Sequence, residues 1–416
     1  MTPEIKHRIG QIRRGEVPEG YVKKRKVVIP QQWGLPQIKD IASISSGSTP
    51  NRNNSEYWNG NIAWVTTGEL SSGHVNHTSE LITVKAVKET KMRIYPQGTL
   101  LIAMYGQGKT RGTVAILEID AAVNQACAAI TVKDGKSKFL FYQLKNSYQD
   151  IRKLSNTGNQ ENLNADIIKT YQVPWAPDEE QERISTILTT QDKVLELKEK
   201  RLAEKQRQKK YLMQQLLTGK KRLPGFYGAW SFPKAKELFQ SVSDKDHNGD
   251  LAVLSSTQDR GIVPRDEVDI DIKYDACSLV NYKKVSKGNF VISLRSFQGG
   301  IEYSTYTGLV SPAYTVLSSR KEISDGYYKQ FFKSTDYINR LNVAVYGIRD
   351  GKQISYEDFG RLRIPYPPIK EQNAIAEALS AADREIDLLR QDIEQEKQKK
   401  KALMQLLLTG IARVKT

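Results

Sequence analysis

The sequence has few of the residues that build metal and nucleophilic sites. It contains two cysteines and four histidines in 416 residues. Cys127 and Cys277 lie far apart and match no paired metal or redox spacing. The nearest histidine pair, His74 and His77, has no cysteine cluster beside it. We therefore predict that the chain holds no metal ion.

Long apolar runs are also missing. No stretch approaches the roughly 18 apolar residues of a membrane span. The first ten residues lack the apolar core of a secretory signal. Together with the low cysteine content, these features lead us to expect a protein of the reducing cytoplasm.

Catalytic signatures are absent as well. Gly-Lys-Thr at 108–110 lacks the earlier glycine of a phosphate-binding loop, since Ala103 stands in its place. Glu-Thr-Lys at 89–91 has no Pro-Asp pair before it at the distance nucleases need, and neither a Gly-x-Gly-x-x-Gly motif nor an Asn-Pro-Pro-Tyr-like methyltransferase loop occurs. We predict a chain that is not an enzyme and uses no cofactor.

What the chain has in excess is positive charge. Lysine and arginine number 63 against 47 acidic residues, which gives a net charge of +16. The excess is spread along the whole sequence and forms no single basic tail. A polyanionic partner, above all nucleic acid, is favoured, although dispersed positive charge also occurs in proteins that are only soluble.

A long internal repeat organises the sequence. Two dodecamers, LMQQLLTGKKRL at 212–223 and LMQLLLTGIARV at 403–414, are nearly the same. A shift of 191 residues aligns 173–223 with 364–414 without a gap, with 18 identities in 51 positions. Such a repeat predicts two copies of one structural unit.

Each copy is expected to form a long helix, because apolar residues recur at alternating steps of four and three, the heptad spacing of a coiled coil. The predicted interface residues are Ile184, Leu188, Leu195, Leu202, Leu212 and Leu216 in the first copy, and Ile375, Leu379, Ile386, Leu389, Ile393, Leu403 and Leu407 in the second. The two seams share a frame but differ in polarity, which favours pairing within the chain as an antiparallel coiled coil. Dimerisation through such a stripe is the simpler alternative.

The sequence also indicates where the helices begin and end. Asp178 is expected to cap the first helix, with Gln181 three residues later as in a capping box. Gly219 and Gly410 stand where a helix ends in a left-handed residue.

Two segments of similar length flank the first helix. Residues 33–173 and 230–364 contain short β-like runs, such as GTLLIAMY (98–105) and GNFVISLR (288–295), with glycine-rich turns. We predict two α+β globular domains built on one plan, a spacer helix and linker at 174–229, and a second spacer helix at 365–416. Residues 1–32 include IRRGEVPEGY, a shortened copy of LTGKKRLPGF (217–226), and should complete the second half-repeat. The order is circular, with a pseudo-two-fold relation between the halves.

Several motifs in this order resemble one known family. They are SSGSTPNR (45–52), YWNGNIAW (57–64), NQACAAI (124–130), GNQENLN (158–164) and the Pro-Pro…Glu-Gln stretches that open helices ending in LLTG. Over essentially the whole chain they resemble the specificity subunit of type I restriction–modification systems. The second domain lacks the Ser-Gly-x-Thr-Pro and Tyr-Trp-x-Gly stretches, so its recognition surface is harder to place.

The resemblance implies a non-catalytic subunit that binds double-stranded DNA. Each target-recognition domain would read one half of a split, asymmetric site, and the helices would set the spacing and dock two methyltransferase subunits. A restriction and translocase subunit would join the complex. The alternatives are a coiled-coil scaffold that binds protein or RNA, and the recognition half of a bifunctional restriction–methylation enzyme.

Polar residues on loops are the candidates for DNA contact, because base readout uses Arg, Lys, Asn, Gln, Ser and Thr. In the first domain they are Ser48, Thr49, Asn51, Arg52, Thr66, Thr67, Tyr105, Gln107, Lys109, Arg111, Asn124, Gln125, Asn159 and Gln160. In the second they are Ser255, Ser256, Thr257, Gln258, Arg260, Arg295, Gln298, Tyr314 and Arg349. Gln107, Lys109 and Arg111 alternate on a turn and are expected to project together. Asn124 and Gln125 either read bases or satisfy the backbone of their own turn.

Overall fold

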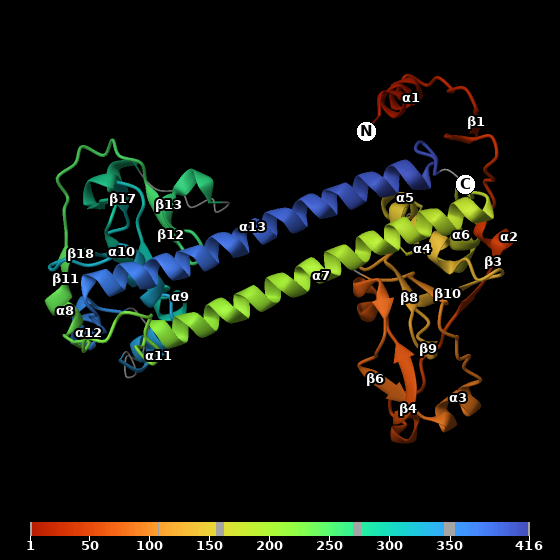
Figure 1. Cartoon of the computed structure of the whole chain (residues 1–416). Helices are drawn as coiled ribbons and strands as arrows, with labels where there is room; N and C mark the ends of the chain where they lie inside the picture. The colour runs from red at the N-terminus through yellow and green to blue at the C-terminus, as the bar shows by residue number, and fades with distance from the viewer. Residues whose placement is uncertain (1, 107, 155–161, 269–275, 345–353, 415–416) are drawn as a thin grey trace. The chain divides into compact units, whose positions relative to one another are not determined.

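The computed structural model describes residues 2–106, 108–154, 162–268, 276–344 and 354–414 (Figure 1). The chain divides into two compact units, residues 1–197 with 393–416 (unit 1) and residues 198–392 (unit 2). Each unit holds one globular domain and one end of each of two long helices, α7 (Asp178–Leu216) and α13 (Ile369–Leu408). Within the described residues no helix combines the length and apolarity that crossing a bilayer requires.

Within its described residues, unit 1 contains sheets with strand orders β3-β10-β7-β8-β5, β6-β4-β9 and β1-β2. Its strands are β1 (Tyr21–Lys24), β2 (Val27–Pro30), β3 (Ala42–Ser46), β4 (Trp58–Val65), β5 (His74–Val75), β6 (Glu80–Ile82), β7 (Leu100–Ala103), β8 (Val114–Leu117), β9 (Ala121–Val123) and β10 (Cys127–Val132). Its other helices are α1 (Pro3–Arg13), α2 (Ile38–Ile41), α3 (Val84–Thr90), α4 (Ser137–Asn146), α5 (Tyr148–Lys153) and α6 (Ala165–Thr170).

Unit 2 contains sheets of order β11-β18-β15-β16, β12-β13 and β14-β17. Its strands are β11 (Phe239–Val242), β12 (Leu254–Thr257), β13 (Gly261–Pro264), β14 (Lys283–Val285), β15 (Phe290–Ile292), β16 (Glu302–Tyr303), β17 (Gly308–Val310) and β18 (Thr315–Ser319). Its other helices are α8 (Ala235–Leu238), α9 (Ser296–Gly299), α10 (Asp325–Phe331), α11 (Thr335–Ala344) and α12 (Tyr356–Arg361).

The two globular domains share a plan, as the sequence predicts. In each, the first sheet strand pairs antiparallel with the last strand, which pairs in turn with a central strand: β3-β10-β7 in unit 1 and β11-β18-β15 in unit 2. The central strands β7 and β15 are the predicted runs GTLLIAMY and GNFVISLR. The α+β class is therefore confirmed.

The long helices pair antiparallel within each unit, which confirms the predicted coiled coil. In unit 2, Lys198 contacts Asp392 at 2.9 Å and Lys205 contacts Glu385 at 2.9 Å, so the numbers rise along α7 as they fall along α13. The polar residues that interrupt one seam thus meet acidic residues of the other helix.

The repeat reappears in these contacts. Asp192 pairs with Lys400 in unit 1, and Asp383 pairs with Lys209 in unit 2. A shift of 191 residues converts Asp192 into Asp383 and Lys209 into Lys400. Both residues of the pair are identical in the two copies because each copy supplies one acid and one base.

Most of the predicted interface residues are buried or half-buried, and the departures lie near the ends of α7 and α13. Ile184 and Leu188 are buried and Leu195 and Leu202 are half-buried, but Leu212 is 37% exposed and Met213 turns inward in its place. In α13, Leu403 is only half-buried, and Met404 is buried beside it. A helix with 3.6 residues per turn drifts away from a strict 3.5-residue repeat, which moves the buried position on by one residue.

The start of α7 differs from the prediction at Asp178 and Gln181. Asp178 is the first residue of α7, not its cap, and its carboxylate lies 2.5 Å from Nζ of Lys136. Gln181 is also not part of a capping box, because its Nε2 donates to the carbonyl of Ala176 at 2.7 Å. At the other ends the prediction is confirmed: Gly219 and Gly410 have φ angles of +72° and +70°, in the left-handed region.

The ends of α7 and α13 contribute apolar side chains to the cores of the two units. Ile184, Leu188, Leu407 and Leu408 pack in the main core of unit 1, and Leu216, Leu217, Ile375 and Leu379 pack in that of unit 2. An aromatic group centred on Phe239 fills the second core. Burial of these apolar side chains in the domain cores stabilises the spacer helices.

Residues 2–32 pack on the end of α13. Tyr21 donates its hydroxyl proton to the carbonyl of Gly410 at 2.7 Å, and Arg8 donates to the carbonyl of Ile411. The stacked Arg8 guanidinium lies 4.9 Å from the Tyr21 ring centre.

Cys127 on β10 offers a simple test of core order. It is fully buried, and burial raises the pKa of its thiol to about 12. Because the thiolate is the reactive species, a Cys277→Ser variant should react with a thiol reagent at pH 8 on the order of a thousandfold slower when folded than when unfolded. Comparable rates in the two states would contradict this packing.

Candidate nucleic-acid interface

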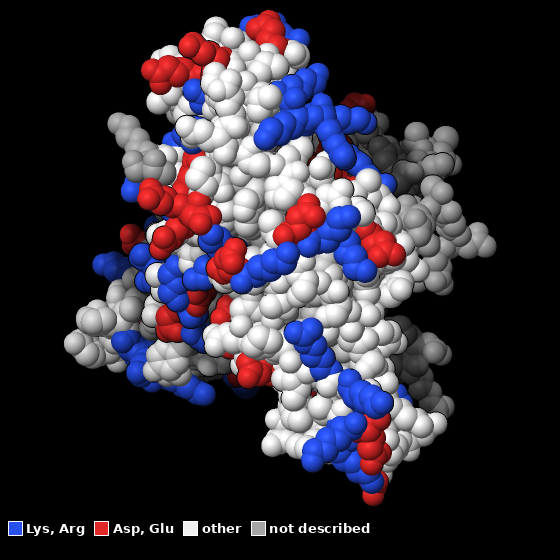
Figure 2. All heavy atoms as spheres, turned by 90° about the vertical axis from the view of Figure 1, so that its right-hand side faces the viewer, with Lys and Arg blue, Asp and Glu red and all other residues white. Residues whose placement is uncertain are grey.

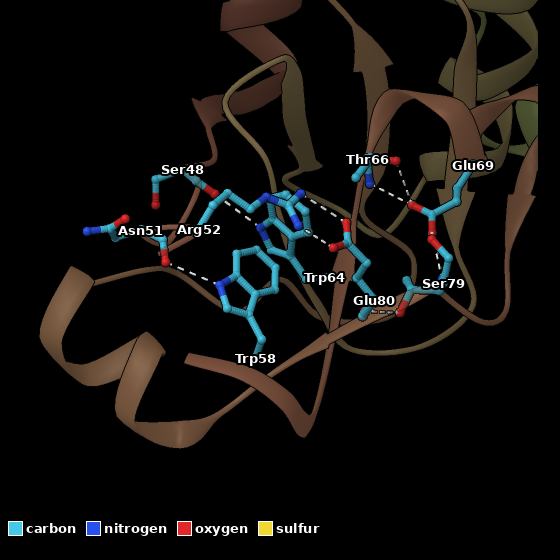
Figure 3. Close-up of polar contacts among 10 residues, drawn as sticks. Ser48, Asn51, Arg52, Trp58, Trp64, Thr66, Glu69, Ser79 and Glu80 are labelled. Carbon is cyan, nitrogen blue, oxygen red and sulfur yellow. Dashed lines mark hydrogen bonds and ion pairs between the residues drawn. The ribbon is translucent and has the colours of Figure 1, made fainter. Parts of the chain in front are cut away.

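The loop 47–54 of unit 1 is held by two tryptophans of β4. Trp64 Nε1 donates to the carbonyl of Ser48 at 3.1 Å, and Trp58 Nε1 donates to the carbonyl of Asn51 at 3.2 Å (Figure 3). The two rings meet edge to face with centroids 5.3 Å apart. The motifs SSGSTPNR and YWNGNIAW therefore form one structure, in which the strand fixes the backbone of the loop.

Two glycines of these motifs allow close backbone approach. A Cβ on Gly47 would lie 1.8 Å from the carbonyl oxygen of Val123, and one on Gly60 would lie 2.3 Å from that of Ile82. No side chain fits at either place, so both glycines are required by packing.

Arg52 is engaged within the loop's own surroundings. Its guanidinium lies over Trp58 at 4.1 Å and near Trp64 at 4.9 Å, and both terminal nitrogens bind the Glu80 carboxylate, Nη2 to Oε2 at 3.0 Å. The hydrogen bonds from Arg52 lower the pKa of Glu80. The sequence proposed Arg52 as a DNA contact and gave no sign of this pairing.

The loop still presents small polar side chains. Thr49 and Asn51 are exposed and Ser48 is half-buried. The hydroxyl of Thr49 donates to Oε1 of Gln125, so two candidate segments meet here. Asn124 accepts from the amide of Ala126 at 3.2 Å, which is the local turn role that the sequence left open for it.

A second carboxylate orders the neighbouring loop. Glu69 accepts from the amide and hydroxyl of Thr66, at 2.6 and 3.2 Å, and from the amide and hydroxyl of Ser79, at 2.8 Å each. Thr66 and the adjacent Thr67 are half-buried. The amide and hydroxyl of Thr66 are therefore both engaged in a capping box with Glu69.

The glycine-rich turn 105–112 differs from its prediction. Tyr105 and Lys109 are exposed, but Arg111 is only 7% exposed. The carbonyls of Lys109 and Arg111 accept from Tyr148 and Arg152 of α5, at 2.6 and 2.8 Å. Anchoring by α5 places Arg111 beneath the turn, so Arg111 does not project together with Lys109. Gln107, Asn159 and Gln160 lie outside the described residues.

In unit 2, candidate residues gather around Tyr314. Burial raises the pKa of Tyr314, and the positive charges of Arg265 and Arg295 oppose that rise. Arg265 Nε donates to the hydroxyl of Ser255 at 3.2 Å, and Lys283 donates to the carbonyl of Tyr314 at 2.7 Å. The sequence missed Arg265 and Lys283, since no spacing rule links Arg265, which follows β13, or Lys283 of β14 to a tyrosine 49 or 31 residues further along the chain.

The half-buried Lys333 joins two further loops of unit 2. Lys333 Nζ donates to the carbonyls of Gln258 and Gly299, at 3.2 and 2.9 Å, and to Glu302. Burial raises the pKa of Glu302, and Lys333 counteracts the rise. Gln258 and Gln298 are thereby brought to one exposed region.

The remaining candidates of unit 2 have local roles or lie outside the described residues. Arg260 is exposed and donates to the carbonyl of Glu267 at 3.0 Å. Ser256 and Thr257 are half-buried, and Thr257 donates to the carbonyl of Gly261 at 2.9 Å. Arg349 lies outside the described residues.

The surface charge is mixed. On the face drawn in Figure 2, lysine and arginine side chains form several separate groups with acidic residues among them. Among the residues described here, no group of three His, Cys, Asp or Glu side chains is placed to hold a metal ion.

Two buried carboxylates that were not among the predicted site residues lie at the junctions between domain and helix. Glu180 accepts from Trp33 Nε1 at 2.8 Å and from Arg413 at 2.7 and 3.0 Å. Glu371 accepts from Trp230 Nε1 at 2.9 Å and from Arg222 at 2.5 and 2.6 Å. Both carboxylates are fully buried.

Known proteins share this organisation. The type I restriction modification DNA specificity domain matches residues 30–207 and again residues 229–398. The MjaIX specificity subunit of Methanocaldococcus jannaschii is 34% identical over 178 residues, which cover 41% of this chain and 40% of that subunit. The putative MjaX specificity subunit of the same organism is 26% identical over 425 residues, 96% of this chain and 98% of that protein.

A solved structure agrees in fold. The S subunit of a type I restriction–modification system from M. genitalium aligns with a TM-score of 0.54 and 13% identity, over 93% of this chain and 98% of that one. With the two domain matches covering most of the sequence, the conclusion is direct: the chain belongs to the family of type I restriction–modification specificity subunits.

Proposed function

We propose that this chain is the non-catalytic subunit that selects the DNA sequence for a type I restriction–modification complex. Each globular domain reads one half of a bipartite, asymmetric site, and the long helices dock two methyltransferase subunits and set the spacing. A restriction and translocase subunit completes the complex. The subunit needs no cofactor of its own.

One observation carries this proposal. Two domains share a sheet plan and identical helix junctions, while the loops they expose differ: unit 1 has the Trp58, Trp64 and Arg52 group, and unit 2 has the group around Tyr314. A common frame with different polar side chains is what reading two different half-sites requires.

A mobility-shift series with and without methyltransferase subunits tests the function. Weak binding by the chain alone and strong, sequence-dependent binding by the complex are expected. The scaffold alternative predicts no salt-dependent DNA affinity, since only phosphate contacts release counterions. Methyl transfer by the chain alone would contradict the proposal.

Partner docking along α7 has its own test. Reversing charges at exposed positions such as Glu182 and Lys193 should weaken assembly with the methyltransferase subunits about tenfold or more, because charge reversal places like charges together across an interface. DNA contacts should change little once the complex is saturated. Unchanged assembly, or DNA binding lost at saturation, would contradict this division of roles.

A further inference from the structure

Arg52 is the exposed arginine of the loop in which the small polar side chains Ser48, Thr49 and Asn51 are presented. Its side chain is 53% exposed, so solvent and a DNA phosphate can both approach it. Yet both of its terminal nitrogens face Glu80, and its flat face lies on Trp58 (Figure 3). The face of the guanidinium is therefore held against Trp58, and the Glu80 carboxylate occupies its two terminal nitrogens.

The partner Glu80 is itself fixed. It begins β6 and stands opposite Trp64 of β4 in the sheet register. The residue before it, Ser79, gives both its amide and hydroxyl protons to Glu69, and Thr78 donates to the carbonyl of Glu80 at 2.8 Å. A carboxylate anchored in this way can hold an arginine in one place.

The Arg52 contact adds to the hydrogen bonds that shape the loop. The carbonyls of Ser48 and Asn51 accept from the two indoles, and the amide of Ser48 donates to the carbonyl of Val123 at 3.0 Å. The amide of Asn53 donates to Oδ1 of Asn51 at 3.0 Å, which orders the turn after Asn51. The Arg52 side chain joins that turn to Glu80 of β6.

We propose that Glu80 is a positioning residue for sequence discrimination by the first domain. Glu80 holds Arg52 against the two tryptophans. This contact keeps Ser48, Thr49 and Asn51 where they can bind base edges, and it prevents Arg52 from binding the DNA phosphates. This inference rests on the proposed function. A bidentate arginine–carboxylate pair has the geometric specificity needed to hold a side chain in one orientation.

Glu80→Gln is the decisive substitution, since a neutral amide cannot bind both terminal nitrogens as a charged acceptor. The released Arg52 should then reach the DNA backbone. Each added phosphate contact steepens the dependence of log affinity on log salt by about 0.9. Discrimination between the correct and a scrambled half-site should fall roughly tenfold, at one half only.

The measurement uses the full chain in complex with its methyltransferase subunits. The duplexes carry the site mapped by methylation sequencing, the same site with either half scrambled, or an unrelated sequence. Arg52→Gln should lose the same discrimination without steepening the salt dependence. Glu56→Gln is the matched control, because Glu56 forms an exposed ion pair with Lys85 in the same domain and lacks the tryptophan stack.

The outcomes separate the possibilities. Lost discrimination in both Glu80→Gln and Arg52→Gln, with a steeper salt dependence in Glu80→Gln only, supports the inference, provided that the thermal unfolding of Glu80→Gln matches that of Glu56→Gln. Unchanged discrimination in Glu80→Gln overturns it, as does a shallower salt dependence in Arg52→Gln, which would mean that Arg52 already binds phosphate. A wild-type complex without sequence discrimination would overturn the proposed function together with this inference.

Discussion

Replacing Arg222 with methionine is expected to destabilise unit 2 by about 3 kcal/mol. Glu371 is fully buried, and Arg222 supplies both of its charged hydrogen bonds. Among the described residues, the Trp230 indole is then the one side chain that still donates to the buried carboxylate. Breaking a buried ion pair costs roughly 3–5 kcal/mol. We expect the lower end of this range because the Arg222 side chain is 25% exposed.

Chemical denaturation, monitored by hydrogen exchange, measures the change in the free energy of unfolding of each unit separately. Arg413→Met should destabilise unit 1 by a similar amount, because Arg413 holds Glu180 in the same way. Arg361→Met is the control: Arg361 pairs with Glu357 on the surface, where an ion pair contributes less than about 1 kcal/mol. A loss at Arg222 no greater than this control would contradict a structural role for the junction.

Gly47→Ala is expected to cost roughly 3 kcal/mol in unit 1 and to remove specific DNA binding through the first domain. The new Cβ would lie 1.8 Å from a backbone oxygen of β9, so the conflict cannot be relieved by turning a side chain. The loop would have to move away from Val123, and the tryptophan hydrogen bonds to Ser48 and Asn51 would be lost with it.

Gly68→Ala provides the comparison for this prediction. Gly68 lies in the same domain, and the nearest atom to a Cβ there is the Thr66 hydroxyl at 3.8 Å. Thermal unfolding and the affinity for each half-site should stay near wild type. Equal behaviour of the two variants would show that the close approach at Gly47 does not control the loop.

The repeat allowed the helices, their antiparallel pairing and the α+β domains to be predicted, because periodic burial and turn residues follow from local geometry. The two buried carboxylates at the junctions could also have been predicted from the sequence. Glu180, Glu371, Arg222 and Arg413 occupy equivalent positions in the two copies, and charged residues kept identical between diverged copies indicate a shared contact.

The candidate site was less predictable because loop spacing does not determine which way a side chain points. Arg111 looked as available as Lys109, yet anchoring by α5 buries it. Arg52 pairs with Glu80, and the charge of Arg265 acts on Tyr314. In both cases tertiary folding brings together segments of the chain that no local pattern connects.

Sequencing the methylated adenines of the host, with and without this gene, tests the central claim most directly. The proposed function predicts one bipartite, asymmetric motif that disappears when the gene is removed and whose half-sites change separately when each globular domain is exchanged. A methylation pattern that does not depend on the gene, or one in which exchanging a single domain alters both halves, would contradict it.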